Sequence, residues 1–239
     1  MKSASPQLAL DFHPRPHGGA RKGAGRKPRA DRTGFVSHLV RQTYDGKYPL
    51  HITVRALAAP SLRQPEIYAA LKAVFAKSSE KGFRLLHFSV QHNHIHLIVE
   101  ADAAEKLARG MQRLLSRSAM AVNAVAGRKG KLWRDRYHRQ DLKTPTTVRN
   151  AFVYVLFNSR KHDFIGKDLM RLLESIDPCS SAAWFDPTGW KKDRAPAPDD
   201  IRAAGPSIVA EPTTWLARVG WKKSPRGLLS IVESPTIAH

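Results

Sequence analysis

Phe83-Arg-Leu-Leu-His-Phe-Ser-Val-Gln-His-Asn-His-Ile-His-Leu-Ile-Val-Glu100 is the stretch of sequence that decides the fold. It consists of two apolar runs, Phe83–Gln91 and His94–Glu100, separated by the polar pair His92-Asn93. Two runs rich in β-branched and aromatic residues, divided by a short polar break, predict a β-hairpin.

Strand and helix patterns alternate on both sides of this hairpin. His51–Ala56 and Leu132–Leu142 have the pattern of strands, whereas Glu66–Gly82 and Ala104–Ala126 place apolar residues at helical spacing. The order strand, helix, strand, strand, helix, strand is that of the ferredoxin-like split β-α-β fold. We therefore predict an α+β domain in which a four-stranded antiparallel sheet carries both helices on one face and leaves the other face for a ligand.

The chain divides into three parts by composition. Residues 1–46 are rich in Gly, Pro and basic side chains and predict a flexible arm. Residues 47–165 form the predicted domain, and residues 166–239, with short segments and recurring Pro and Trp, form a C-terminal extension. Basic residues of the arm are candidates for DNA contacts in a groove or along phosphates: Arg21, Lys22, Arg26 and Lys27.

Size and cysteine content exclude several classes of protein. A chain of 239 residues can bury one good core but would be crowded by two large domains. Cys179 is the only cysteine, which excludes an internal disulfide and a cysteine-based zinc cage. The longest apolar stretches are far too short to span a bilayer. We expect a cytoplasmic protein with no membrane partner.

The net charge of +20 is unevenly distributed. Residues 1–165 hold 30 Lys and Arg against 11 Asp and Glu, whereas residues 166–239 hold 10 against 9. A field of this kind favours a polyphosphate partner, because each neutralised phosphate releases counterions. A basic, highly soluble surface without a dedicated partner is the alternative.

His94 and His96 lie within the second run of the hairpin. Strand alternation places both imidazoles on one face, about 7 Å apart along the backbone, where they can converge on one divalent ion. The chain has 11 histidines, so the pair alone is a weak indication of a metal, and structural histidines explain it as well.

A further helix is predicted from Thr146 or Thr147 to about His162, following Pro145. One side of it is apolar, and a separate polar stripe is formed by Asn150, Tyr154, Asn158 and Lys161. Such a stripe would face a confined site. The simpler interpretation is that Tyr154 anchors the helix by packing and one hydroxyl hydrogen bond.

The strand Asn93–Leu97 and the later pair Tyr154 and Asn158 together resemble the single-tyrosine HUH transposases (IS200-like), specifically the REP-associated tyrosine transposases. The resemblance extends to His51–Arg55 and to Gly130–Arg134, and spans about residues 49–162. It departs from the family at Gln91-His92, where many relatives have Met-Pro.

This resemblance implies an enzyme that cuts and rejoins single-stranded DNA carrying a hairpin, such as a REP-like repeat, with a divalent metal, Mg²⁺ or Mn²⁺. It implies that Tyr154 attacks the phosphate and becomes linked to a DNA 5′-phosphate. His94 and His96 would hold the metal, with Asn158 as third ligand where many relatives have Gln. The protein would act as a monomer or a homodimer.

Basic and aromatic residues interleave around the fourth predicted strand. Trp133 could stack on an unpaired base while Arg134 and Arg136 contact phosphates, or the tryptophan could belong to the core. Arg55 on the first strand and Lys161 on the last helix are further candidates for nucleic-acid binding.

The sequence is also compatible with two other functions. A non-catalytic nucleic-acid-binding protein derived from a transposase would explain the charge equally well. A two-histidine RNA phosphoesterase would pair His51 with the histidines of the His94–His96 motif as general base and acid, but would leave Tyr154 and Asn158 unexplained.

Overall fold

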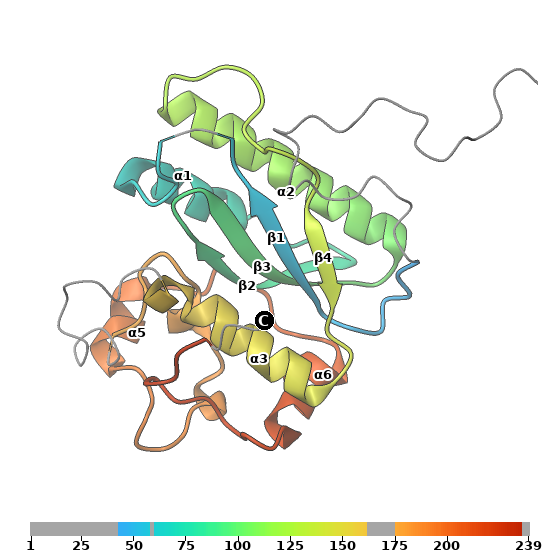
Figure 1. Ribbon diagram of the computed structural model, residues 1–239, viewed down its shortest axis with the longest axis vertical. Coiled ribbons are helices and arrows are strands. Elements are labelled where there is room, and N and C mark those ends of the chain that lie inside the picture. Colours follow the sequence, from blue (N-terminus) through green and yellow to red (C-terminus); the bar gives the residue numbers. More distant parts are fainter. Residues whose placement is uncertain (1–42, 58–59, 162–174, 236–239) are drawn as a thin grey trace, which may run out of the picture. The chain divides into compact units, whose positions relative to one another are not determined.

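Four strands form one antiparallel sheet in the order β2-β3-β1-β4 (Figure 1). The computed structural model describes residues 43–57, 60–161 and 175–235, all within one compact unit that runs from Val36 to His239. The strands are β1 (Leu50–Arg55), β2 (Phe83–Val90), β3 (His94–Ala101) and β4 (His138–Asp141). This order and the two connecting helices confirm the ferredoxin-like prediction.

The predicted hairpin forms between β2 and β3. Val90 pairs with Ile95, and the backbone N–H of Gln91 donates to the carbonyl of His94 at 2.9 Å to close the turn. The register shifts between Leu85 and His87, a bulge that puts the consecutive residues Leu86 and His87 on the same face of the sheet.

Helices α1 (Pro65–Phe75) and α2 (Ala104–Val125) cover one face of the sheet (Figure 1). The core beneath them takes inward-facing residues of β1, β2 and β3 and the apolar faces of both helices. Gly110 lets α2 lie directly on β2, because a Cβ atom there would come within 2.2 Å of the Phe83 ring. Members of this core include Leu50, Ile52, Val54, Leu71, Phe75, Phe88, Leu97, Val99, Met111 and Leu114.

Helix α3 (Pro145–Leu156) and the C-terminal segment, residues 175–235, cover the opposite face. The start of α3 is defined by a capping box, in which Thr144 and Thr147 exchange side-chain and backbone hydrogen bonds. Proline follows in the first turn of the helix. A second core joins Ile98 of β3 to α3 and to short helices of the C-terminal segment, among them α6 (Trp215–Arg218). Helix α5 (Pro198–Ala204) lies farther along the same segment.

Three predicted elements are shorter in the structure. Helix α1 ends at Phe75 because Ser78 donates to the Phe75 carbonyl and the chain then turns through Gly82, which has φ +87°. Strand β4 lacks residues 132–137 because the chain bends at residues 134–136, where the Asp135 carboxylate accepts the Arg136 N–H at 2.8 Å. Only an isolated bridge at Trp133 precedes the strand.

Helix α3 ends at Leu156 instead of His162. A 3-10 turn, Asn158–Lys161, follows it. The buried Arg160 guanidinium donates to the carbonyls of Ile231 and Glu233, each at 2.5 Å, which draws this turn toward the C-terminal segment. The predicted boundary at residues 165/166 lies outside the described residues.

Glu100 anchors the C-terminal segment to the sheet. Its carboxylate is fully buried and accepts the backbone N–H and hydroxyl of both Thr213 and Thr214, at 2.6–3.1 Å, as well as Arg84 Nε at 3.3 Å. Charge-assisted hydrogen bonds of this kind are the strong ones in proteins.

We expect Glu100→Gln to lower the free energy of unfolding by about 3 kcal/mol, because the amide cannot accept all of these donors and leaves some buried and unpaired. Urea denaturation measures the change. Glu105→Gln, an exposed change in the first turn of α2, is the matched control and should have almost no effect. Equal stability of the two variants would contradict this role of Glu100.

His87 is buried between the sheet and the C-terminal segment. Its ring packs edge-on against Phe152, 5.2 Å between centroids, and its Nδ1 lies 3.2 Å from the Ser181 hydroxyl. Burial lowers the pKa of His87 from 6.5 to about 3. The unfolded chain therefore binds one more proton than the folded protein at this residue between these two pH values.

It follows that His87 stabilises the fold fully above pH 6.5 and progressively less as the pH falls toward 3. We expect the wild-type protein to lose about 2 kcal/mol more stability between pH 7 and pH 5 than His87→Gln, which cannot be protonated. Urea denaturation at both pH values tests this. Parallel pH dependences of the two proteins would contradict it.

Candidate functional site

A cavity of about 410 Å³ opens between α3 and the strands β1 and β4. Its sheet wall and its helix wall carry both polar and apolar side chains, and two residues of the C-terminal segment complete it. The lining residues are His51, Thr53, His138, Gln140, Leu142, Thr147, Asn150, Ala151, Val153, Tyr154, Arg226 and Pro235.

His94 and His96 lie side by side on β3, as the alternation predicts. Their ring centroids are 4.8 Å apart and the rings are perpendicular. His94 Nδ1 lies 2.8 Å from the Asn93 side-chain oxygen and donates to it, an interaction that orients the ring.

His96 is buried and contacts two side chains of β1. Its Nδ1 lies 3.2 Å from His51 Nε2 and 3.1 Å from the Thr53 hydroxyl. The β1–β3 register explains these contacts, since Thr53 stands opposite His96 and His51 faces the same side two residues away. Engagement of Nδ1 leaves the opposite nitrogen, Nε2, as the one that a metal would use.

Tyr154 reaches the same cluster from α3. Its ring meets His96 edge-on at 4.9 Å between centroids, and His51 at 5.5 Å. The tyrosine is half-buried and lines the cavity. The structure thus brings three of the four predicted catalytic and metal-binding residues, His94, His96 and Tyr154, into one cluster.

Burial lowers the pKa of His51 to about 4, although a hydrogen bond that the ring donates to the Gln140 side chain opposes this shift and the nearby His138 adds to it. His51 is therefore neutral at pH 7. A neutral imidazole can hydrogen-bond to His96 without placing a second positive charge beside it.

Asn158 lies in the 3-10 turn after α3 and does not line the cavity. Its side chain is 1% exposed, and neither its amide oxygen nor its amide nitrogen hydrogen-bonds to a described residue. A buried amide of this kind is costly without a ligand.

No group of three or more His, Cys, Asp or Glu side chains suited to a metal ion occurs within residues 43–57, 60–161 and 175–235. The predicted ligand set differs from such a group because its third member is an amide. Its two imidazoles are suitable donors for a divalent transition metal.

The predicted nucleic-acid contacts have different environments. Trp133 belongs to the core, because only 8% of its surface is exposed and its indole N–H donates to the Leu115 carbonyl at 2.8 Å. Of the two interpretations of this residue, the structure supports the core over base stacking. Arg55 is exposed at the end of β1, and Arg134 and Arg136 are half-buried. Arg21, Lys22, Arg26, Lys27 and the side chain of Lys161 lie outside the described residues.

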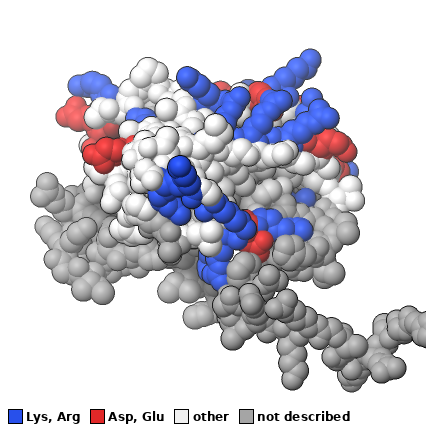
Figure 2. All heavy atoms as spheres, turned by 90° about the horizontal axis from the view of Figure 1, so that it is seen from above, with Lys and Arg blue, Asp and Glu red and all other residues white. Residues whose placement is uncertain are grey.

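An exposed basic ridge runs along α2, formed by Lys106, Arg109, Arg113 and Arg117 at helical spacing. Seen from the side on which α2 lies, basic side chains clearly outnumber acidic ones (Figure 2). None of the described helices is long and apolar enough to cross a membrane.

Several cavity residues were not among the predicted site residues. Thr53 and Gln140 could have been found by continuing the strand alternation of His51 onto its neighbours. Arg226 had no signal in the sequence, because its place in the cavity depends on how the C-terminal segment folds back.

Solved structures that resemble this chain include two transposases. One, described as a REP-associated tyrosine transposase bound to a REP hairpin, has 16% sequence identity and a TM-score of 0.48, covering 61% of this chain and 82% of that chain. The other, a putative transposase from Deinococcus radiodurans, has 17% identity and a TM-score of 0.35, covering 44% of this chain and 86% of that chain. No curated protein matches the chain.

The family model described as "Transposase IS200 like" matches residues 46–155. This range contains the whole sheet, helices α1 and α2, the three clustered histidines and Tyr154. Residues 46–155 are thus similar to the IS200-like transposase family.

Proposed function

We propose that this protein is a REP-associated tyrosine transposase, which cleaves and rejoins single-stranded DNA that carries a hairpin. The observation that carries the proposal is the edge-on approach of Tyr154 to His96, 4.9 Å between ring centroids, at the wall of the cavity. A nucleophile beside a pair of imidazoles is an arrangement suited to phosphoryl transfer.

In the proposed reaction the Tyr154 hydroxyl oxygen attacks a DNA phosphorus atom. The bond from phosphorus to the 3′-oxygen breaks, which leaves a 3′-hydroxyl and a 5′-phosphotyrosine. The phosphotyrosine bond keeps the energy of the broken phosphodiester, so a 3′-hydroxyl can attack it and rejoin DNA without a nucleotide cofactor.

His94, His96 and Asn158 would hold a divalent metal. When bound, such an ion supplies positive charge to the non-bridging phosphate oxygens. The buried Asn158 amide, which has no hydrogen-bond partner among the described residues, supports its role as third ligand. A donor set of two imidazoles favours Mn²⁺ over Mg²⁺, which prefers oxygen ligands.

The proposed partner is a DNA hairpin flanked by unpaired bases. The net charge of +20 supports a nucleic-acid partner. Passive DNA binding would explain the charge, but gives no reason for the rings of Tyr154 and three histidines to cluster beside the cavity. The two-histidine phosphoesterase is disfavoured because His51 and His96 are in direct contact, with no space for a phosphate between them.

To test the nucleophile, we would incubate the protein with a single-stranded hairpin oligonucleotide and Mn²⁺ and resolve the products on a denaturing gel. We expect a covalent protein–DNA adduct with the wild-type protein and none with Tyr154→Phe, because the phenyl ring lacks the attacking oxygen. Binding of the uncleaved oligonucleotide should remain within about twofold of wild type.

Tyr48→Phe is the matched control, since Tyr48 is half-buried and does not line the cavity. It should form the adduct at the wild-type rate. An adduct that persists in Tyr154→Phe would exclude Tyr154 as the nucleophile.

Metal binding can be tested without activity by calorimetric titration of the DNA-free protein with Mn²⁺ or Mg²⁺. We expect tighter binding of Mn²⁺, a loss of affinity of at least about 100-fold in His96→Ala, and a smaller loss in Asn158→Ala. His92→Ala, an exposed change on the hairpin turn, should bind like the wild type. Unchanged affinity in His96→Ala would refute this metal site.

A further inference from the structure

The C-terminal segment contributes a cation to the cavity that contains Tyr154. Arg226 lines this cavity, although it is 72 positions beyond Tyr154 in the sequence. Among the described lining residues, Arg226 alone has a permanent charge, and no aspartate or glutamate lines the cavity.

A buried arginine on α3 holds this part of the C-terminal segment in place. Arg149 donates from Nε to the Gly227 carbonyl at 2.6 Å, and from its second terminal nitrogen to the Leu228 carbonyl at 3.1 Å and to Glu233 at 2.6 Å. It is 1% exposed. The residue next to Arg226 is thus tied to the helix that carries Tyr154.

The turn around Arg226 is itself well defined. The Gly227 N–H donates to the Ser224 carbonyl at 2.8 Å, and Gly227 has φ +61°, a conformation that other residues rarely adopt. Glu233 also accepts the Ser230 N–H at 3.0 Å. The backbone on both sides of Arg226 is therefore constrained while its side chain stays exposed to solvent.

We infer that Arg226 binds a phosphate of the DNA strand that enters the cavity, and that Arg149 positions it there. The guanidinium group presents five donors in a planar fork that matches phosphate oxygens, and no carboxylate of the described lining competes for it. This inference rests on the proposed function for the nature of the ligand. It assigns part of DNA binding to the C-terminal extension.

The test measures the salt dependence of DNA binding, which counts phosphate contacts. The probe is a fluorescein-labelled single-stranded hairpin oligonucleotide, and all proteins carry Tyr154→Phe so that no adduct forms. We expect Arg226→Ala to weaken binding about threefold to tenfold and to reduce the slope of log affinity against log salt by about 0.7. Arg226→Lys should keep most of the slope, since it keeps the charge.

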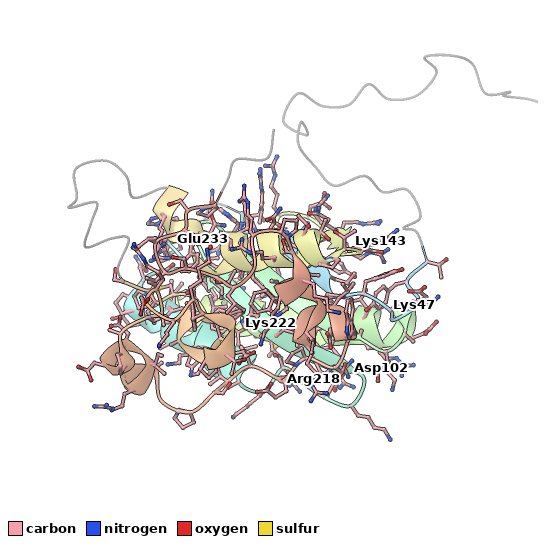
Figure 3. The ribbon with its side chains drawn as sticks, turned by 90° about the horizontal axis from the view of Figure 1, so that it is seen from below. Lys47, Asp102, Lys143, Arg218, Lys222 and Glu233 are labelled. Atoms are coloured by element: carbon pink, nitrogen blue, oxygen red, sulfur yellow. The ribbon has the colours of Figure 1, made fainter. Side chains whose placement is uncertain are left out.

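Arg218→Ala is the matched control. Arg218 is an exposed arginine of the same segment that does not line the cavity, and it lies apart from Glu233 in Figure 3. It should leave the slope unchanged. Equal slopes for Arg226→Ala and Arg218→Ala would overturn the inference. The slope needs no cleavage, so a wild-type protein that forms no adduct would contradict the proposed function without affecting this result.

A double-mutant cycle tests the positioning by Arg149. Arg149→Lys keeps a positive charge but cannot make all three hydrogen bonds, so we expect Arg226→Ala to cost less in that background than in the parent protein. Thermal unfolding of each variant verifies that the proteins are folded at the assay temperature. Strictly additive losses would show that Arg149 does not position Arg226.

Discussion

The antiparallel pairing of β1 with β3 is the interaction on which the site depends. Its register sets Thr53 opposite His96 and turns His51, His94 and His96 to the same face. Since side chains alternate along a strand, a slip of one residue would turn these histidines into the core under α1 and α2 and bring Ile52 and Ile95 to the cavity. The apolar residues of both strands therefore protect the site geometry, because their burial opposes any such slip.

Burial of the opposite face of the sheet has a different origin. There, α3 packs on Ile98 and Leu86, and the C-terminal segment packs on α3 in turn. Buried charged groups join these layers, with Glu100 binding Thr213 and Thr214, and Arg149 binding the carbonyls of Gly227 and Leu228. Such interactions are directional and leave a costly unpaired group when broken, so they determine one arrangement of the C-terminal segment more sharply than apolar contact alone.

The sequence predicted the part of the structure that local patterns control. Alternation around His94 and His96 predicted their common face, and the spacing of apolar residues after Pro145 predicted α3 and the place of Tyr154. The predicted end of α3 at about His162 was wrong, because Arg160 binds the carbonyls of Ile231 and Glu233. No local sequence pattern encodes these contacts. Contacts between residues far apart in the sequence also determine that Trp133 is buried in the core, so its pattern alone could not decide between core and surface. The same holds for Arg226, which no sequence pattern associates with Tyr154.

The histidines and Tyr154 consequently differ in what holds them in place. The histidines lie on adjacent central strands, so their mutual positions change only if the sheet does. Tyr154 lies on a helix that contacts the sheet on one side and the C-terminal segment on the other. The distance between the tyrosine and the histidines, on which the proposed chemistry depends, is therefore sensitive to the packing of residues 175–235. A segment that supplies no predicted catalytic residue thus takes part in setting the geometry of the site.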